Sequence, residues 1–475
     1  MILLRAIIAI AVIEAAGALA LRWLMRPQRS VMNLEFLGLA FGLGIGMISL
    51  GTFYLAFAGA QLNPSSVSMF VGGLFAGLIT LNASSRSRAA QKEAQLEEPR
   101  KKCGLNRIEL ALAAMIFASC FLVAIDALSQ PILGFDARAI WGMKAKIIFS
   151  NHQIYGEDFL DPDRLHAKQR YPLGLPLALN FTYQAMGQLN DRFVKVIFAA
   201  FFLALPCFFY GALRRIFDKS YSLLGTCLLS TLPCFTIYAN GGAASGYSDV
   251  PLTYFYTVFA LSLFLWFRQN YTGDFVLALV FGIFALFTKN EGLPLWGITL
   301  MCFVFCQPGS KGRQLPRLGW LAFLLVASLA ALLPWHLYRS QLPLLEEDYF
   351  QLLTLANLVA GIDRLLYVST SFLREFILRP HLWSLLGPCL ALAFCASPRL
   401  GIGRSHGVFL RISALYCGFL VLIYLVIPWE MDELIPVSLT RLLMPLSPVL
   451  VFWLLFQTKE TKLLPEGRWT SPAPK

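Results

Sequence analysis

Residues 108–128 read IELALAAMIFASCFLVAIDAL, an almost uninterrupted apolar run. Its length matches the roughly 20 residues that an α-helix needs to cross a bilayer. The rest of the chain follows the same pattern, because 57% of its 475 residues are hydrophobic, only 14% are charged and the mean hydropathy is +0.64. The sequence therefore predicts an all-α polytopic membrane protein.

Apolar runs of similar length recur along the chain, and together they predict about thirteen transmembrane helices. The predicted spans are 1–21, 35–59, 65–82, 108–128, 193–213, 220–240, 250–267, 274–288, 293–306, 318–337, 382–397, 409–428 and 442–457.

A polar segment separates the first three spans from the others. Residues 83–106 are rich in Ser, Arg, Lys, Gln and Glu and contain few apolar side chains, which is typical of a solvated linker. We therefore divide the chain into three leading transmembrane helices (1–82), a cytoplasmic linker (83–106), a main transmembrane region (107–457) and a cytoplasmic tail (458–475).

Basic residues indicate the orientation of the chain, because Lys and Arg accumulate in cytoplasmic loops. A cytoplasmic linker places the N-terminus and the long loops 129–190 and 338–380 on the outer face, together with most of the Asp and Glu residues. Both loops contain amphipathic stretches, which we expect to lie on the membrane and to cover an outward-facing cavity. The net charge of +12 is then a signal of topology, and no nucleic-acid partner is expected.

The segment 134–146, GFDARAIWGMKAK, reads as a short helix at the outer interface. Charges at a lipid interface must find water or a partner, so Asp136 and Lys144 need an explanation. Two interpretations stay open for each residue. Asp136 serves chemistry or only caps its helix, and Lys144 binds a ligand or only anchors the helix beside Trp141.

Two further motifs fall on the same outer face. Residues 170–176, RYPLGLP, contain two prolines that favour a broken or re-entrant segment next to Tyr171. Residues 240–251, NGGAASGYSDVP, form a small-residue loop that lets a ligand approach the backbone, and they bring Asp249 to the start of a helix. Asp249 is either functional or part of an N-cap.

The motif at residues 288–292, TKNEG, places Lys289 and Glu291 between two apolar runs. A charge at the centre of a membrane helix costs about 2.5 to 3.5 kcal/mol on insertion scales, so such charges are usually paired or functional. We expect both residues to lie close to Asp249, because each flanks the start of a helix on the outer face. Glu291 then pairs with Lys289 or binds a sugar hydroxyl, unless both charges simply reach water from a hairpin loop.

Four short motifs resemble those of the membrane-embedded glycosyltransferases with the GT-C fold, especially the branch with the protein O-mannosyltransferases and the lipid A aminoarabinose transferases (glycosyltransferase family 39-like). The motifs are 135–141 (FDARAIW), 249–252 (DVPL), 288–292 (TKNEG) and 441–445 (RLLMP). The resemblance covers roughly residues 108–457, which implies that the main transmembrane region is a GT-C-like catalytic domain.

The resemblance implies roles for these residues. In that family an acidic residue of the first large outer loop is catalytic, so Asp136 is the expected base. A polyprenyl-phosphate sugar donor keeps its phosphate at the interface, where Lys144, Lys289 and Arg441 are the candidates for holding it. The other candidate substrate-binding residues are Asp249, Glu291 and Tyr171.

The chain also departs from the family. Many relatives have an adjacent acidic pair where this chain has a single Asp136, so no cofactor is certain and a requirement for a divalent metal stays open. Three additional helices precede the helix that leads to Asp136, so the helices of this chain do not correspond one to one with those of the family.

The expected function is transfer of a sugar from a polyprenyl-phosphate donor to an envelope glycan, lipid or protein acceptor on the non-cytoplasmic face. The resemblance implies a bacterial inner membrane, with the site facing the periplasm or exterior. A transporter or lipid flippase is the alternative, because such proteins also have many helices and intramembrane charges. The sequence has no convincing internal repeat, its acidic residues lie mostly on one side, and Glu14 in the first span is the one clear polar candidate at mid-membrane depth, all of which count against transport. A noncatalytic subunit of an envelope assembly would not explain the acidic motifs.

Overall fold

The computed structural model describes residues 1–25, 33–89, 104–160, 168–239, 241–306, 314–342, 349–396 and 405–460. Within these ranges every regular element is a helix, which confirms the all-α prediction. Most of the linker predicted at 83–106, the tail beyond residue 460 and Asn240 of the small-residue loop lie outside the described residues.

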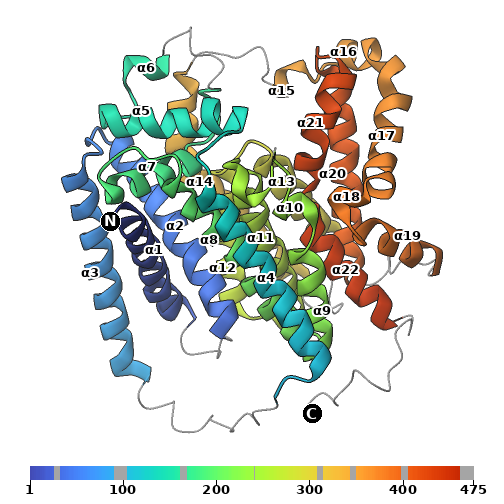
Figure 1. Cartoon of the computed structure of the whole chain (residues 1–475), viewed down its shortest axis with the longest axis horizontal. Helices are drawn as coiled ribbons and strands as arrows, with labels where there is room; N and C mark the ends of the chain where they lie inside the picture. Colours follow the sequence, from blue (N-terminus) through green and yellow to red (C-terminus); the bar gives the residue numbers. More distant parts are fainter. Residues whose placement is uncertain are drawn as a thin grey trace.

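The three leading helices lie side by side along one flank of the molecule (Figure 1). They are α1 (Ile2–Leu24), α2 (Asn33–Phe57) and α3 (Pro64–Ala89). A Cβ atom on Gly17 would lie 1.7 Å from the carbonyl oxygen of Ala40, and one on Gly44 would lie 1.8 Å from that of Ile13. Only glycine permits this approach of α1 to α2, as in many membrane helix pairs.

The centre of the bundle is α11 (Asp249–Gln269), whose most apolar stretch is completely buried. A helix that is apolar around its whole circumference belongs in such a position. It packs against α8 (Val196–Arg214), α12 (Thr272–Leu286), α13 (Gly292–Cys306) and α22 (Leu446–Glu460). The hydroxyl of Tyr254 on α11 also donates to the Gly38 carbonyl of α2. The leading helices therefore share one bundle with the rest of the protein.

The helix formed by the apolar run at 108–128 lies at the periphery of the bundle. It is α4 (Arg107–Ser129), which crosses the outside of the bundle diagonally, with only 11% of its most apolar stretch buried (Figure 1). Its first turn is fixed by a capping box, in which Asn106 accepts from the Glu109 backbone and Glu109 accepts from that of Asn106. The remaining helices of the bundle are α9 (Lys219–Ser230), α14 (Gln314–Ser340), α19 (Leu386–Ala396), α20 (Gly407–Val426) and α21 (Met431–Leu443).

The predicted count of about thirteen spans is not confirmed. The described residues contain eight helices that are long and apolar enough to cross a membrane, or nine if α21 and α22, which meet at a bend of 54°, form one span. The number of long helices is lower than predicted because several apolar runs are interrupted. Span 220–240 stops at Ser230 and resumes as the short α10 (Pro233–Thr236), because proline cannot donate to the preceding turn.

The predicted outer loops fold into short helices at the end of the bundle opposite the start of α4 (Figure 1). Among the described side chains of these loops, α16 and α17 expose apolar residues as an amphipathic interfacial helix should, whereas α7 is buried against α1 and α2. The loop elements are η2 (Ala137–Gly142), α5 (Met143–Asn151), α6 (Glu157–Leu160), α7 (Gly174–Met186), α15 (Tyr349–Leu352), α16 (Leu355–Ala360), η6 (Ile362–Arg364), α17 (Leu365–Leu378) and α18 (Pro380–Trp383).

Candidate active site

Most of the predicted site residues meet in one chain of ion pairs, which we call the charge network. It consists of Asp136, Arg441, Asp249, Lys289 and Glu291. Asp136 immediately precedes η2, Asp249 begins α11, Lys289 and Glu291 form the turn between α12 and α13, and Arg441 belongs to the last turn of α21. Four separate segments therefore contribute to one site.

The distances within the charge network are those of hydrogen-bonded ion pairs. Arg441 Nη1 lies 2.7 Å from Asp136 Oδ2, and its Nε lies 3.1 Å from Asp249 Oδ2. Lys289 Nζ lies 2.9 Å from Asp249 Oδ1 and 2.8 Å from Glu291 Oε1. The expected proximity of Lys289 to Asp249 is thus confirmed, and Arg441 extends the same cluster to Asp136.

The two ends of the charge network are more accessible than its middle. The side chains of Asp249 and Lys289 are 1% and 5% exposed, whereas those of Asp136 and Glu291 are 28% and 19% exposed. Buried charges are tolerated only when they are paired, so the central pairs hold the three helices α11, α12 and α21 in register. Asp136 is the carboxylate best placed to meet a ligand from outside.

Helix geometry favours the positions of the two central charges. Asp249 lies in the first turn of α11, where the helix dipole stabilises an anion, and Pro251 suits the same turn because it has no N–H to satisfy. Arg441 lies in the last turn of α21, where the dipole stabilises a cation.

Asp136 does not act as a side-chain cap. It holds the N-cap position of η2, but its carboxylate accepts no cap hydrogen bond there and bonds to Arg441 instead. The element that follows, η2, is a π-helix, a rare form that is often found at functional sites. The capping interpretation of Asp136 is therefore not supported. No pattern in residues 134–146 predicts the π-helix.

Tyr247 is a member of the site that the sequence did not indicate. The guanidinium of Arg441 lies 4.3 Å from the centre of its ring, within the range of a cation–π contact. A Cβ atom on Gly134 would lie only 2.6 Å from the Tyr247 ring, and a Cβ atom on Gly241 would lie only 2.8 Å from the Arg441 side chain. The two glycines therefore allow the loops before η2 and α11 to close on Arg441.

Lys144 and Tyr171 form a separate contact. The amine of Lys144 donates to the carbonyl oxygens of Lys168 (2.6 Å) and Tyr171 (3.3 Å), and it lies 5.8 Å from the ring centres of Trp141 and Tyr171. Lys144 is 1% exposed. Burial, together with the charge of Lys168, lowers the pKa of the Lys144 amine well below its usual range. In this structure the contacts of its amine hold the 168–171 turn.

A buried carboxylate supports Arg441 from the second outer loop. Glu375 on α17 accepts hydrogen bonds from Trp383 Nε1 (3.1 Å) and from the hydroxyl of Thr440, and pairs with Arg379 at 3.1 Å. Thr440 is the neighbour of Arg441 in α21, so α17 fixes the turn that carries the guanidinium. A lone glutamate in an amphipathic stretch gave no sequence signal for this role.

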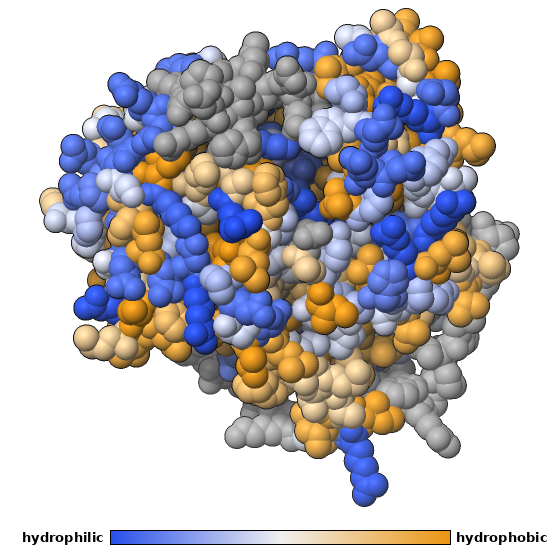
Figure 2. Space-filling view, turned by 45° about the horizontal axis from the view of Figure 1, so that its top comes forward, coloured by the Kyte–Doolittle hydropathy of each residue, from blue (hydrophilic) through white to orange (hydrophobic). Residues whose placement is uncertain are grey.

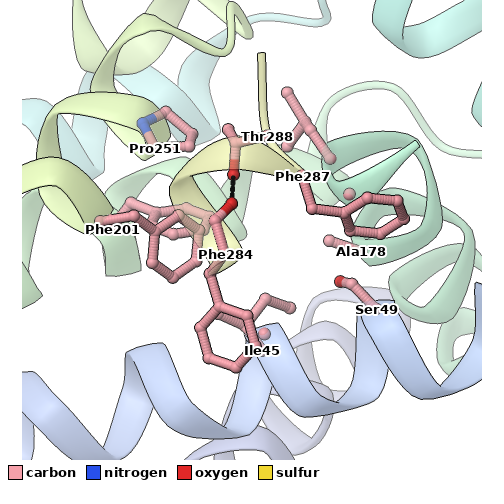
Figure 3. Close-up of a pocket in the computed structure, with 12 residues that line it drawn as sticks. Ile45, Ser49, Ala178, Phe201, Pro251, Phe284, Phe287 and Thr288 are labelled. Atoms are coloured by element: carbon pink, nitrogen blue, oxygen red, sulfur yellow. Dashed lines mark hydrogen bonds between the residues drawn. The ribbon is translucent and has the colours of Figure 1, made fainter. Parts of the chain in front are cut away.

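A pocket is lined by residues that are close in sequence to two members of the charge network (Figure 3). Its cavity volume is about 20 Å³, enough for one water-sized group. Its walls include Pro251, which follows Asp249 by two residues, and Thr288, which precedes Lys289. Thr288 Oγ1 donates to the Phe284 carbonyl at 2.6 Å, so its hydroxyl is satisfied. Apart from Ser49 and Thr288, the lining residues are apolar. Ile45 on α2 forms the opposite side of the pocket.

The outer end of the molecule is hollowed. Figure 2 shows a hollow between the side of α5 and the side of α17, with hydrophilic residues inside it. Among the described residues, no group of three or more His, Cys, Asp or Glu side chains is arranged to hold a metal ion. The charge network alone is therefore not a metal-ligand set.

No family model, curated protein or solved structure matches the chain. The fold, with its long apolar helices, is that of a multi-pass helical membrane protein.

Proposed function

We propose that the protein is a membrane glycosyltransferase of GT-C type, which moves a sugar from a polyprenyl-phosphate donor to an envelope glycan, lipid or protein acceptor. The observation that carries the proposal is the charge network, in which the carboxylate of Asp136 and the cation of Arg441 share one partly open site. We place the site on the non-cytoplasmic face of a bacterial inner membrane, in line with the resemblance and the distribution of basic residues.

The donor has an apolar chain and a charged phosphate, and the proposed site likewise has an apolar part and a charged part. The pocket that Pro251 and Thr288 line is small and apolar, so it suits contact with a hydrocarbon group rather than with a phosphate. Lys289 and Arg441 supply positive charge for the phosphate. Within the described residues Arg441 uses Nε and Nη1 for its two carboxylates, so Nη2 is left for a phosphate oxygen.

The proposed reaction is a single displacement. The acceptor hydroxyl attacks the anomeric carbon, the bond from that carbon to the phosphate oxygen breaks, and the hydroxyl proton passes to Asp136 Oδ1 or Oδ2. The electron pair of the broken bond stays on the polyprenyl phosphate, where Arg441 and Lys289 stabilise the growing charge. Attack opposite the leaving group inverts the configuration at the anomeric carbon.

The test is reconstitution of the full chain with radiolabelled polyprenyl-phosphate sugars and a crude envelope acceptor fraction. We expect covalent transfer of label to the acceptor and none in protein with Arg441→Met. Translocation of the donor across the vesicle membrane without bond cleavage would instead establish the alternative.

That alternative, a transporter or lipid flippase, is favoured by one observation. Glu14 lies near the middle of α1, and within the described residues its buried Oε1 has no hydrogen-bond partner. Unpaired carboxyl groups at this depth often mark translocation pathways. Glu14→Gln should abolish translocation if the alternative holds, and should leave glycosyl transfer unchanged if the proposal holds.

A further inference from the structure

Arg441 lies beside a bend in the chain, where a helix depends on its surroundings for support. It belongs to the last turn of α21, and the direction of the chain changes by 54° between α21 and α22. The last carbonyl groups of an α-helix have no partner within the helix, so contacts from outside must fix the final turn. The position of that turn matters, because a misplacement of about 1 Å by a distant change can lower a reaction rate about 10²-fold.

The support comes from Glu375 on α17, which packs against both α20 and α21 (Figure 1). The hydroxyl of Thr440 donates to Glu375 Oε1, and both side chains are buried. The same oxygen accepts from Trp383 Nε1 at 3.1 Å, and Glu375 Oε2 pairs with Arg379 Nη1 at 3.1 Å. Three donors therefore orient one carboxylate, and Thr440 is held by an acceptor whose own position is fixed.

Both ends of α17 are held close to other helices. Before α17, a Cβ atom on Gly361 would lie 2.0 Å from the carbonyl oxygen of Leu425 at the end of α20. After α17, a Cβ atom on Gly387 in the first turn of α19 would lie 1.9 Å from the carbonyl oxygen of Phe376. These close approaches leave little room for α17 to slide, so Glu375 reaches α21 from a rigid frame.

A strained residue follows Trp383 directly. Ser384 has a φ of 50° and a ψ of −128°, values that suit glycine in a type II′ turn and strain a residue that has a Cβ atom. Such a conformation persists only where the surrounding contacts enforce it. Trp383 is fully buried, its ring centre lies 4.7 Å from that of Phe376, and its Nε1 donates to Glu375. Backbone strain clusters at functional sites, which favours a role for this corner beyond packing.

We propose that Glu375 is a positioning residue for the proposed reaction. It holds Thr440 and thereby fixes the turn of α21 from which Arg441 reaches the charge network. The inference rests on the proposed function for the identity of the ligand as a phosphate-linked donor. It assigns the second outer loop, which carries no member of the charge network, to the assembly of the site.

The test removes the link between Glu375 and α21 without removing a charge. Thr440→Val deletes the donating hydroxyl and keeps the size of the side chain, whereas Thr440→Ser keeps the hydroxyl. The matched control is Thr226→Val on α9, which deletes a buried hydroxyl that donates to the Ser222 carbonyl at 2.7 Å. Each variant is made in the full chain and purified in detergent. If Thr440→Val does not fold, Glu375→Asp withdraws the same acceptor by one methylene and carries the same expectations.

The first measurement needs no substrate. It is the rate at which phenylglyoxal, an arginine-specific reagent, modifies Arg441, read by mass spectrometry of the digested protein. Loss of a hydrogen bond to a charged group changes an equilibrium about tenfold, so Thr440→Val should raise the rate at Arg441 by about that factor. Thr440→Ser and Thr226→Val should leave it unchanged. Arg215, whose Nη1 donates to Asp274 Oδ1 at 2.7 Å outside the charge network, is the internal reference and should react equally in every protein.

The second measurement is transfer of label from polyprenyl-phosphate sugar in the reconstituted protein. Thr440→Val should lower kcat/KM about tenfold in the wild-type background. In an Arg441→Lys background it should cause no further loss, because the guanidinium that the hydroxyl positions is absent. A purely structural role for Thr440 predicts the same relative loss in both backgrounds.

Two results would overturn the inference: an unchanged rate of Arg441 modification in Thr440→Val, or an equal increase in Thr226→Val. Failure of the proposed function is seen separately. If Arg441 becomes more reactive in Thr440→Val but the wild type transfers no label, Glu375 still positions Arg441 and the glycosyltransferase proposal falls. If the wild type transfers label and Thr440→Val behaves like the control, the glycosyltransferase proposal stands and the positioning role falls.

Discussion

Arg441 Nη1 lies 2.7 Å from Asp136 Oδ2, which joins the last turn of α21 to a carboxylate 305 residues earlier in the chain. The same guanidinium reaches Asp249 through Nε and covers the Tyr247 ring. One side chain therefore sets the relative positions of the loop before η2, the start of α11 and the end of α21.

Asp136→Asn separates a chemical role from a structural one. The amide keeps the size of the side chain and an oxygen that accepts from Arg441, so the protein should insert and fold. Transfer of sugar should fall by about 10² to 10⁴, the usual contribution of general acid–base catalysis, with donor binding retained. Near-normal turnover in a well-folded variant, measured with labelled donor, would move the catalytic role to another carboxylate.

Arg441→Lys tests whether the geometry of the guanidinium matters beyond its charge. A lysine ammonium is a point charge and lacks the planar fork that here bonds two carboxylates and covers a ring. We expect weaker donor binding and lower stability. Arg441→Met should be worse, lowering the free energy of unfolding by about 3 kcal/mol, because it removes one partner of the buried Asp249. Equal stability of the two variants would contradict this view.

Exchange of Lys289 and Glu291 tests the interior of the network. If the two residues were an isolated pair, the double variant Lys289→Glu/Glu291→Lys would restore it. The structure predicts no restoration, because the new carboxylate at position 289 would face Asp249, which is 1% exposed. The single variant Glu291→Gln is the control, since it keeps the Lys289–Asp249 pair and should fold. Recovery of stability by the exchange would count against the described arrangement.

Lys144 gives the protein a predicted pH dependence. Since burial lowers the pKa of its amine in the folded state, the unfolded chain binds more protons between that lowered pKa and about 10.4. Stability of the wild type relative to Lys144→Met should therefore rise with pH across this window, by at most about 1.4 kcal/mol per pH unit. Chemical unfolding at pH 7, 8 and 9 measures this, and a constant difference would mean that the amine stays charged among its carbonyls and rings.

The orientation in the membrane is tested by cysteine labelling. Ser150 is exposed at the end of α5, and position 87 lies at the far end of α3. A membrane-impermeant thiol reagent should label Ser150→Cys from outside intact cells and Ser87→Cys only after permeabilisation. The parent protein, which has ten cysteines of its own, gives the background. Labelling of both positions from one side would remove the basis for an outward-facing site.

Sequence reasoning found the charged members of the network because a charge beside an apolar run is conspicuous, and because unpaired charges are costly there. It did not find which charges pair, since the contact of Arg441 with Asp136 spans 305 residues and leaves no local pattern. Lys144 is a candidate for holding phosphate because of its charge, whereas the backbone carbonyls that its amine contacts in the structure have no sequence signature.

An uncharged member of the site was missed for a related reason. Tyr247 resembles the other aromatic residues of an aromatic-rich chain, and only the fold shows that Arg441 lies over its ring. The helix count was too high because apolar windows continue through breaks such as the one between Ser230 and Pro233.

The charge network contains three carboxylates and two cations, so with every group ionised it has an excess of one negative charge. A phosphate group that entered it would increase the excess, and in a poorly screened interior this costs several kcal/mol. Local electroneutrality therefore requires that a proton or a counter-cation enters together with an anionic ligand. Donor affinity should accordingly depend on pH or on the cations in the medium, independently of any role of those cations in bond cleavage.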